Sequence, residues 1–242
     1  MLKACLNGSV TRSEHLAVPI TAAELAADAV EVRAAGATAV HIHPRGEDGR
    51  ESLDATAVGE AVAAIRAASP GLPIGVSTGA WIEPDPARRI AAIGAWRVLP
   101  DFASVNVHED GAARVARELS ARGIGVEAGI WTPMAADAFL TWDTPTLRIL
   151  VEVMEADPAE ALRNADAIIR RLRTRRVLLH AEGPAVWPIL RRAIRYNMDI
   201  RIGLEDTRTL PDGAPAPDNA TLVAVAASIR ENERCEAGQE GL

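Results

Sequence analysis

Short apolar runs rich in β-branched residues alternate along the whole chain with longer stretches whose apolar positions recur at helical spacing. The short runs predict strands over residues 2–6, 37–43, 73–77, 102–107, 125–130, 147–153, 177–181 and 200–204. The longer stretches predict helices over residues 21–35, 54–68, 86–96, 112–122, 133–139, 158–173, 185–196 and 218–230. The helix at 133–139 has the least regular pattern, so we expect it to be short.

Local signals support several of these boundaries. Thr21 and Glu24 have the spacing of a capping box, and Gly36 follows the same helix as a natural stop. Gly123 ends the helix at 112–122 in the same way, and Ser69-Pro70-Gly71 closes the one at 54–68.

A strand–helix unit repeated about eight times with short loops is typical of a closed (β/α)₈ barrel or of an open doubly wound sheet. An open nucleotide-binding sheet should carry a glycine-rich phosphate turn after its first strand. The chain has a single glycine there, in Leu6-Asn7-Gly8-Ser9. Its length of 242 residues suits a single α/β barrel. We therefore predict an α/β fold, a (β/α)₈ TIM barrel, with residues 1–242 in one domain.

The composition limits the kinds of partner and the cellular compartment that we expect for the protein. The formal charge is −7, whereas nucleic acids and anionic membranes need a positive field over a sizeable face. No apolar run approaches the roughly 18 residues of a membrane span, and the start of the chain lacks the layout of a signal peptide. Cys5 and Cys235 lie far apart and indicate no disulfide framework. We predict a cytoplasmic protein with a small-molecule partner.

Lysine is nearly absent, which disfavours two classes of enzyme. Lys3 supplies one of the 26 basic residues, and arginine supplies the others. Schiff-base aldolases and pyridoxal-phosphate enzymes need an amine beside the substrate. Lys3 begins the first predicted strand, at the end of a barrel opposite the catalytic face.

Polar residues end or follow most of the predicted strands. In a (β/α)₈ barrel the C-terminal ends of the strands gather on one face, where active sites are built. We therefore expect a site on that face. The residues are Asn7, His41, His43, Ser77, Thr78, Asn106, His108, Glu127, Glu152, His180, Glu182, Glu205 and Asp206.

His41 and His43 are separated by one residue on the second predicted strand. The period of two places both imidazoles on one side of the strand, about 6.6 Å apart along it, close enough to bind one ion. Glu205 lies at the end of the eighth strand, so its carboxylate can complete a two-histidine, one-carboxylate metal site. Asp206 points the other way and can act as a base or pair with an arginine. The alternatives are hydrogen-bonded histidines and a helix-capping acid.

Two segments, 38–45 (TAVHIHPR) and 201–207 (RIGLEDT), resemble the signatures of the β-keto acid cleavage enzymes, a family that includes the 3-keto-5-aminohexanoate cleavage enzyme. Three supporting segments follow in the family's order with comparable spacing: 17–21 (AVPIT), 76–79 (VSTG) and 103–106 (ASVN).

The resemblance implies a zinc-dependent barrel enzyme, in family habit a homo-oligomer, that condenses a β-keto acid with acetyl-CoA to give acetoacetate and a new acyl-CoA. His41, His43 and Glu205 would bind the zinc, and Asp206 with Arg201 would be the general base. A β-keto acid offers two oxygens to such an ion, which stabilises the enolate. The resemblance also implies a catalytic Glu127 and substrate contacts from Asn7, Ser77, Thr78, Ser104 and Asn106.

Several of these positions have a structural alternative. The segment 77–79 alone is typical of a strand-ending turn, and Arg201 of a surface residue. Glu127 is harder to explain that way, because an unpaired carboxylate inside a barrel is costly. For the phosphates of CoA, Arg45, Arg50 and Arg89 are candidates by position.

The chain departs from the family pattern in segments 8–11, 108–110, 151–158 and 180–183. All four lie at the predicted mouth, so they bear on the identity of the substrate and on the use of acetyl-CoA more than on the metal.

Two other functions compete. A hydrolase of the amidohydrolase type also uses His-x-His on a barrel strand, with a further histidine and an aspartate, for which His180 and Asp206 are available. That layout places the motif on the first strand, whereas a whole strand–helix unit precedes it here. The other alternative is a non-catalytic metal-binding protein on an enzyme scaffold.

Overall fold

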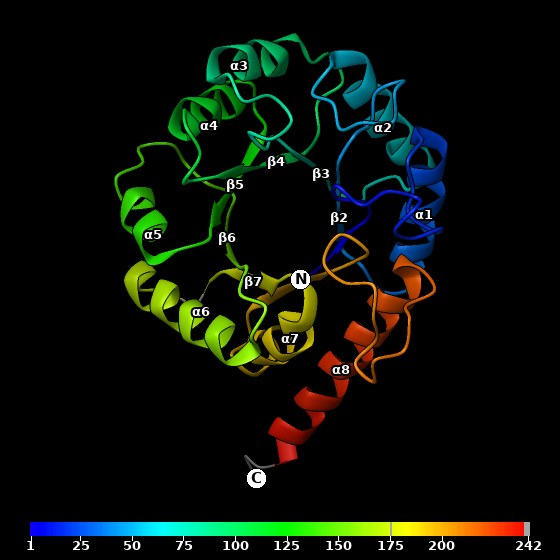
Figure 1. The fold of residues 1–242 in the computed structure, drawn as a ribbon, viewed down its shortest axis with the longest axis vertical. Helices are drawn as coiled ribbons and strands as arrows, with labels where there is room; N and C mark the ends of the chain where they lie inside the picture. Colours follow the sequence, from blue (N-terminus) through cyan, green and yellow to red (C-terminus); the bar gives the residue numbers. More distant parts are fainter. Residues whose placement is uncertain (175, 240–242) are drawn as a thin grey trace.

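Within residues 1–174 and 176–239, which the computed structural model describes, eight parallel strands close into a barrel. Each strand pairs with the next along the chain, and the last pairs with the first (Figure 1). This architecture confirms the predicted single-domain (β/α)₈ TIM barrel. The strands are β1 (Leu2–Cys5), β2 (Ala39–Ile42), β3 (Ile74–Ser77), β4 (Phe102–Asn106), β5 (Gly125–Ile130), β6 (Arg148–Val153), β7 (Leu178–Ala181) and β8 (Asp199–Ile202).

Helices surround the barrel, one after each strand, and the helices predicted in the described part of the chain are all confirmed. Thr21 and Glu24 form the predicted capping box at the first of them. The last helix runs to Gln239 instead of ending at Arg230. The helices are α1 (Ala22–Ala34), α2 (Ala55–Ala68), α3 (Pro86–Ala95), α4 (Ala112–Ala121), α5 (Pro133–Phe139), α6 (Pro158–Leu172), α7 (Val186–Arg195) and α8 (Asn219–Gln239).

The eighth strand ends earlier than its pattern predicted. β8 ends at Ile202, and the chain then turns so that the carbonyl of Gly203 accepts a hydrogen bond from the backbone N–H of Asp206 at 2.9 Å. A Cβ at residue 203 would lie 1.9 Å from the carbonyl oxygen of Cys5, so only glycine allows this approach to β1. Glu205 therefore lies in a turn after β8 rather than at the end of the strand.

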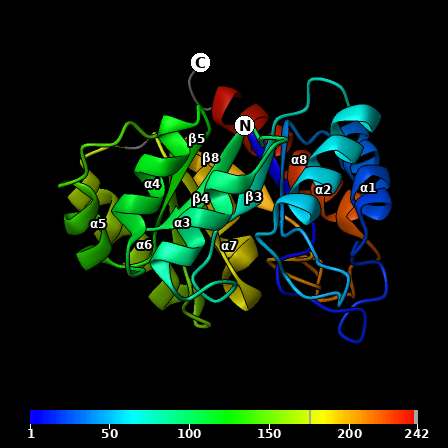
Figure 2. The ribbon, with the colours of Figure 1, turned by 90° about the horizontal axis from the view of Figure 1, so that it is seen from above.

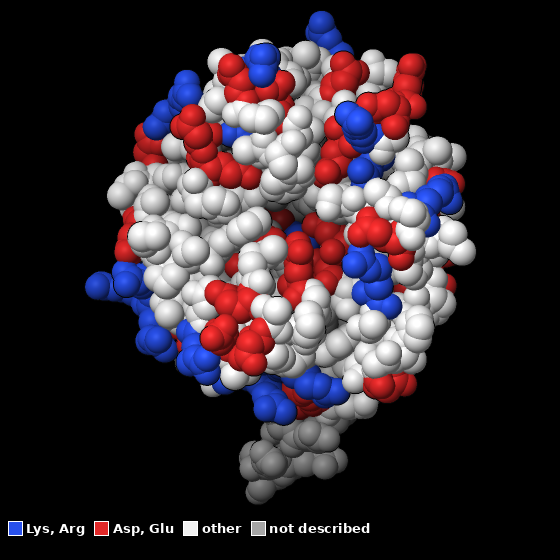
Figure 3. Space-filling model, in the orientation of Figure 1, with Lys and Arg blue, Asp and Glu red and all other residues white. Residues whose placement is uncertain are grey.

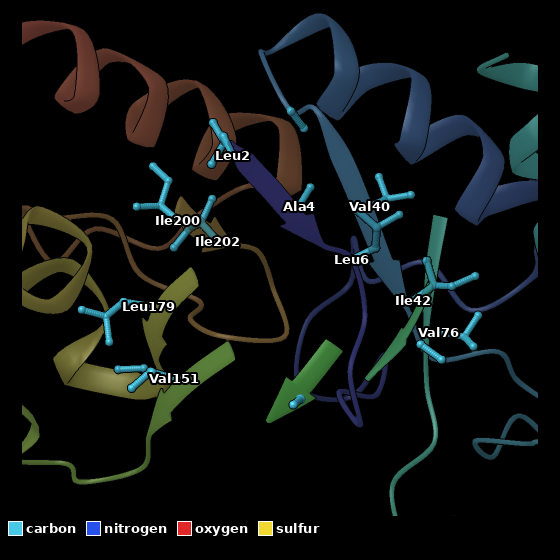
Figure 4. Close-up of a cluster of buried hydrophobic side chains, with 14 of the residues drawn as sticks. Leu2, Ala4, Leu6, Val40, Ile42, Val76, Val151, Leu179, Ile200 and Ile202 are labelled. Atoms are coloured by element: carbon cyan, nitrogen blue, oxygen red, sulfur yellow. The ribbon is translucent and has the colours of Figure 1, made fainter. Parts of the chain in front are cut away.

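The two faces of the barrel wall differ in polarity because successive residues of a strand point to opposite sides. The outward side chains are apolar and form the core with the helices; Figure 4 shows Leu2, Val40, Val76 and Leu179 among them. The inward positions of the strands carry polar groups beside apolar ones such as Leu150. The buried polar residues among them are Lys3, His41, Ser77, Asn106, Glu127, Glu152, His180 and Arg201.

Lys3, Glu127 and Arg148 form an ion cluster inside the barrel, on β1, β5 and β6. Lys3 binds one carboxylate oxygen of the fully buried Glu127, and Arg148 Nη1 donates to the other at 2.6 Å. Burial raises the pKa of Glu127, but the two cations outweigh it and hold the pKa at about 2. The chain's lysine is thus occupied by an ion pair, which agrees with its predicted place away from the catalytic face.

Asn219 ties the start of α8 to the ends of two strands. Its Oδ1 accepts a hydrogen bond from the backbone N–H of Leu204 at 2.7 Å, and its Nδ2 donates to the carbonyl of Leu6 at 2.8 Å. Nδ2 also donates to Asp28 of α1 at 2.7 Å. The segment before Glu205 is therefore held to the end of β1 by a fully buried amide.

The Asp28→Asn variant is expected to be more stable than the wild type above neutral pH. Burial raises the pKa of Asp28 to about 7, against the hydrogen bond from Asn219, which lowers it. A folded-state pKa above the ordinary value near 3.9 means that ionisation costs folding free energy. This cost is absent below about pH 4, grows towards pH 7 and is complete above it. The side-chain oxygen of asparagine can still accept the hydrogen bond from Asn219. Urea unfolding should therefore show a free energy of unfolding about 1–3 kcal/mol higher than that of the wild type at about pH 8, and no difference near pH 4. A gain independent of pH would contradict the explanation.

Among the described residues, none of the helices combines the length and apolar character that a membrane span needs. Cys5 is a buried free cysteine on β1, and the side chain of Cys235 lies outside the described residues. Figure 2 shows the start of the chain on the side of the barrel opposite the loops that follow β1 and β8.

Candidate active site

A cavity of about 230 Å³ lies at the C-terminal ends of the strands. Each of the eight strands, or the segment directly after it, contributes a residue to the lining that the structure describes. In Figure 3 the centre of the molecule is hollowed, and acidic side chains gather there. The barrel therefore brings the polar strand ends together at one mouth, where the sequence predicted the site.

His41, His43 and Glu205 bring three donor atoms together in the wall of this cavity. The Nε2 atoms of the two histidines are 3.1 Å apart, and Oε1 of Glu205 lies 4.0 Å from Nε2 of His41 and 3.5 Å from Nε2 of His43. The side chains are 2, 5 and 10% exposed in that order. Two ligands of one tetrahedral zinc-like ion are about 3.3–3.5 Å apart. The three atoms are thus spaced to share a divalent cation.

The end of β1 lies between the two segments that carry these ligands. Asn7 accepts a hydrogen bond from the backbone N–H of His43 at 2.8 Å and donates to its carbonyl at 2.9 Å. A Cβ on Gly8 would lie 2.5 Å from Cγ of Glu205, and Gly8 has a positive φ of 50°. Asn7 thus fixes the backbone of one ligand, and Gly8 leaves room for the side chain of another.

The loop after β2 folds back and places a carboxylate on His43. A backbone bridge pairs Arg45 with Glu51, and Glu51 contacts Nδ1 of His43. Trp81 donates its Nε1 to the same carboxylate at 3.1 Å. A carboxylate on Nδ1 keeps the proton on that nitrogen, so the lone pair of Nε2 faces the other two donor atoms.

The three donors fit a metal ion on their own chemistry. Oε2 of Glu205 and Nδ1 of His41 are buried without a hydrogen-bond partner among the described residues. Burial lowers the pKa of His41 well below its usual range, so its ring is neutral and can donate a lone pair. Burial also lowers the pKa of His43, but Glu205 and Glu51 outweigh it and raise the pKa to about 9. A divalent cation would replace that proton between the donors.

The Glu51→Gln variant is expected to bind a divalent metal about 10–100-fold more weakly than the wild type, because the amide no longer raises the basicity of His43. A chelator competition titration measures the affinity. Glu60→Gln, an equal change at an exposed position on α2, is the control. If both variants bind as tightly as the wild type, Glu51 does not support the metal site.

Arg201 lines the cavity beside Glu205 and holds Asp206. Its Nη2 donates to Oε1 of Glu205 at 2.7 Å, and its Nε donates to Oδ1 of Asp206 at 3.0 Å. Arg201 and Asp206 are each 3% exposed, so Arg201 is not a surface residue. Burial raises the pKa of Asp206 to about 6, against the lowering effect of Arg201. Oδ2 of Asp206 has no partner among the described residues, and Asp206 itself lies outside the cavity lining.

The structure separates the predicted substrate-contact residues into two groups. Ser77, Ser104 and Asn106 line the cavity at the ends of β3 and β4. Thr78 and Asn7 do not: Thr78 donates its hydroxyl to the carbonyl of Ser104 at 2.7 Å, and Asn7 is bonded to the backbone of His43. Their side chains support the strand ends around the cavity.

Glu127 lies outside the cavity lining, with Lys3 and Arg148. This predicted catalytic residue therefore belongs to the ion cluster inside the barrel and does not lie with the three donor atoms.

The arginines predicted for the phosphates of CoA have different surroundings. Arg89 is 1% exposed and donates to Glu109 at 2.8 Å, so its guanidinium is already bound. Arg45 donates to the carbonyls of Gly8 at 2.5 Å and of Val10 at 3.1 Å. The side chain of Arg50 is 88% exposed.

Several residues at the cavity had no predicted role. The rule that strand ends face the mouth placed Glu152, near the end of β6, and Glu182, directly after β7, at the predicted site without giving them a role; it could also have found Trp131, which directly follows β5. Trp81 and Glu51 lie on loops whose course no strand pattern specifies. The hairpin that pairs Arg45 with Glu51 brings Glu51 back to the metal site.

Fold and site together define a (β/α)₈ barrel with a candidate two-histidine, one-carboxylate metal centre at the mouth. Residues 1–237 match the β-keto acid cleavage enzyme family, so the chain belongs to that family.

Solved structures with the same architecture include two complexes of ObcA. The ternary complex of ObcA with a C4-CoA adduct and oxalate is 17% identical, with a TM-score of 0.66 over 90% of this chain and 64% of that one. The binary complex of ObcA with oxaloacetate is 18% identical, with a TM-score of 0.65 over 87% of this chain and 63% of that one. The native KDPGal structure is 19% identical, with a TM-score of 0.58 over 96% and 94% of the two chains. These likenesses establish the fold, and this chain spans less than two thirds of the length of ObcA.

Proposed function

We propose that the protein is a zinc-dependent β-keto acid cleavage enzyme that condenses a β-keto acid with acetyl-CoA and releases acetoacetate and a new acyl-CoA. The proposal rests chiefly on one observation, the meeting of His41, His43 and Glu205 in the wall of a cavity next to Arg201. Membership of the family supports the substrate class. The ObcA complexes with a C4-CoA adduct and with oxaloacetate, itself a β-keto acid, support the pairing of CoA with such a substrate.

In the proposed reaction C2 of the β-keto acid loses a proton and bonds to the acetyl carbon of acetyl-CoA, and the CoA sulfur leaves. The sulfur then attacks C3, the C2–C3 bond breaks, and its electron pair stays on C2. The proton returns to C2 as acetoacetate forms, and the remaining acyl group is held by CoA. Atoms and charge balance without any further reagent, so one base suffices.

When bound, zinc would polarise the keto and carboxylate oxygens of the substrate and stabilise the negative charge that develops there. We assign Asp206 as the base that takes the proton from C2, and Arg201 as the residue that fixes its carboxylate. Asp206 lies outside the cavity lining, so the transfer requires a bridging water or a rotation of its side chain. Ser77, Ser104 and Asn106, which line the cavity, are proposed to contact the substrate.

The amidohydrolase alternative gains no support from the geometry. His41 lies on β2 and His43 directly follows it, whereas that layout requires the first strand. For the further histidine, His180, Nε2 lies 3.1 Å from Oε2 of Glu152 and Nδ1 lies 3.6 Å from Oδ1 of Asp206. His180 is not one of the three clustered donors.

The proposal is tested by measuring the bound metal and then incubating the protein with acetyl-CoA and a panel of β-keto acids. We expect one zinc per chain and the formation of acetoacetate. Hydrolysis of amides or lactones without CoA would favour the hydrolase. Bound zinc, with no turnover of any keto acid and no effect of Asp206→Asn, would favour a non-catalytic metal protein.

A further inference from the structure

Glu109 folds back from the loop after β4 onto a residue of the cavity lining. Its Oε1 accepts a hydrogen bond from Nδ2 of Asn106 at 2.9 Å, and its backbone N–H donates to the carbonyl of the same residue at 3.1 Å. Asn106 ends β4, is 7% exposed and lines the cavity, whereas Glu109 lies outside the lining. Glu109 belongs to segment 108–110, which departs from the family pattern. A loop that is particular to this chain therefore holds a proposed substrate contact.

A buried arginine holds the carboxylate of Glu109 from the other side. Nη1 of Arg89, on α3, donates to Oε2 of Glu109 at 2.8 Å, and Nη2 donates to the carbonyl of Asp110 at 2.5 Å. The side chains of Arg89 and Glu109 are 1 and 7% exposed. Gly111 lets the loop approach α3, because it has a φ of 73° and a Cβ there would lie 2.5 Å from Cβ of Pro86. One guanidinium thus binds both the backbone of the loop and the carboxylate.

The carboxylate of Glu109 decides which end of the Asn106 carboxamide faces it. The oxygens of a carboxylate accept hydrogen bonds and donate none, so the nitrogen end of Asn106 is the end that can meet them. The oxygen end then lies against β5, where a Cβ on Gly129 would be 2.5 Å from Oδ1. A half-turn of the carboxamide would exchange its donor and acceptor ends. The bond to Glu109 fixes one of these two orientations.

We propose that Glu109, anchored by Arg89, is a positioning residue that fixes the donor and acceptor ends of Asn106 for the substrate. The inference rests on the proposed function, in which Asn106 contacts the substrate. A carboxamide in the opposite orientation would present a donor where the substrate needs an acceptor, or the reverse, and would leave a polar group without a partner. Glu109 therefore contributes to substrate binding through Asn106, without lining the cavity itself.

In Glu109→Gln the carboxamide of Asn106 is expected to turn over. The new glutamine has one oxygen, which Arg89 takes because a guanidinium only donates, so the NH₂ group of the glutamine faces Asn106. With the zinc-loaded protein, acetyl-CoA and the best β-keto acid, kcat/KM should fall at least about tenfold, chiefly through KM. Zinc content should be unchanged, because Glu109 is not one of the three clustered donors. Asp110→Asn removes an exposed neighbouring charge and should keep the wild-type kcat/KM. An unchanged kcat/KM in Glu109→Gln, or a fall confined to kcat, overturns the proposal.

Two measurements separate this inference from the reaction on which it rests. Asn106→Asp sets a second carboxylate against Glu109, so it should lower the Tm of the substrate-free protein. The same change should lower the Tm less in Glu109→Gln, where the glutamine can donate to the new carboxylate. A Tm of Asn106→Asp no lower than that of the wild type overturns the contact, even if Glu109→Gln does not fold.

The second measurement is a calorimetric titration with an unreactive 3-hydroxy analogue of the β-keto acid. Binding to Glu109→Gln that is about tenfold weaker than binding to the wild type supports the role of Glu109, even if no acetoacetate forms. Acetoacetate formation by the wild type, with equal binding of the analogue to both proteins, supports the reaction and rejects the positioning role.

Discussion

Replacing His41 by alanine is expected to abolish metal binding and acetoacetate formation together. His41 supplies one of the three clustered donors, and burial lowers its pKa so that the neutral ring can donate a lone pair to the metal. Loss of a ligand should cost far more affinity than the about 10–100-fold expected for a residue that only supports one. Glu205→Ala should behave in the same way. Zinc content after dialysis, and turnover with the best β-keto acid, are the two measurements.

His15→Ala provides the matched control. His15 is bonded through Nε2 to the carbonyl of Ala216 at 2.9 Å, and it is not one of the clustered donors. The His15→Ala variant should keep its zinc and its turnover. Full zinc content in both His41→Ala and Glu205→Ala, with the proteins folded by circular dichroism, would remove the basis of the metal assignment.

The barrel could be predicted because its strands carry two independent patterns. Outward positions such as Leu2, Val40 and Leu179 must be apolar to pack on the helices, and glycine and proline mark the turns between elements. Inward positions are polar only where the strand ends approach the mouth or an ion cluster forms. His41 and His43 share a face for that reason, and the period of two suffices to find them.

The sequence is less informative where hydrogen bonds between distant segments decide the outcome. Asn7 ends a strand, as a substrate-binding residue would, yet both polar atoms of its amide are used by the backbone of His43. Glu205 was predicted at the end of a strand, but the approach of Gly203 to Cys5 turns the chain first. A pattern shows which way a side chain points; it does not show which atoms have already taken its hydrogen bonds.

The Asp206→Asn variant is expected to keep its zinc and lose turnover. Asparagine has the shape of aspartate and can still accept the hydrogen bond from Arg201. The position of Arg201 beside Glu205 should therefore remain unchanged. Asparagine cannot hold a proton, and removal of a general base typically costs about 10²–10⁴-fold in rate. The loss should appear in kcat more than in KM, because the proposed substrate contacts, Ser77, Ser104 and Asn106, are unchanged in this variant. Zinc content equal to the wild type shows that the metal site has survived. If this variant retains nearly full kcat, the proton must go to another group, and Glu152 is the buried carboxylate in the cavity lining that would be replaced next.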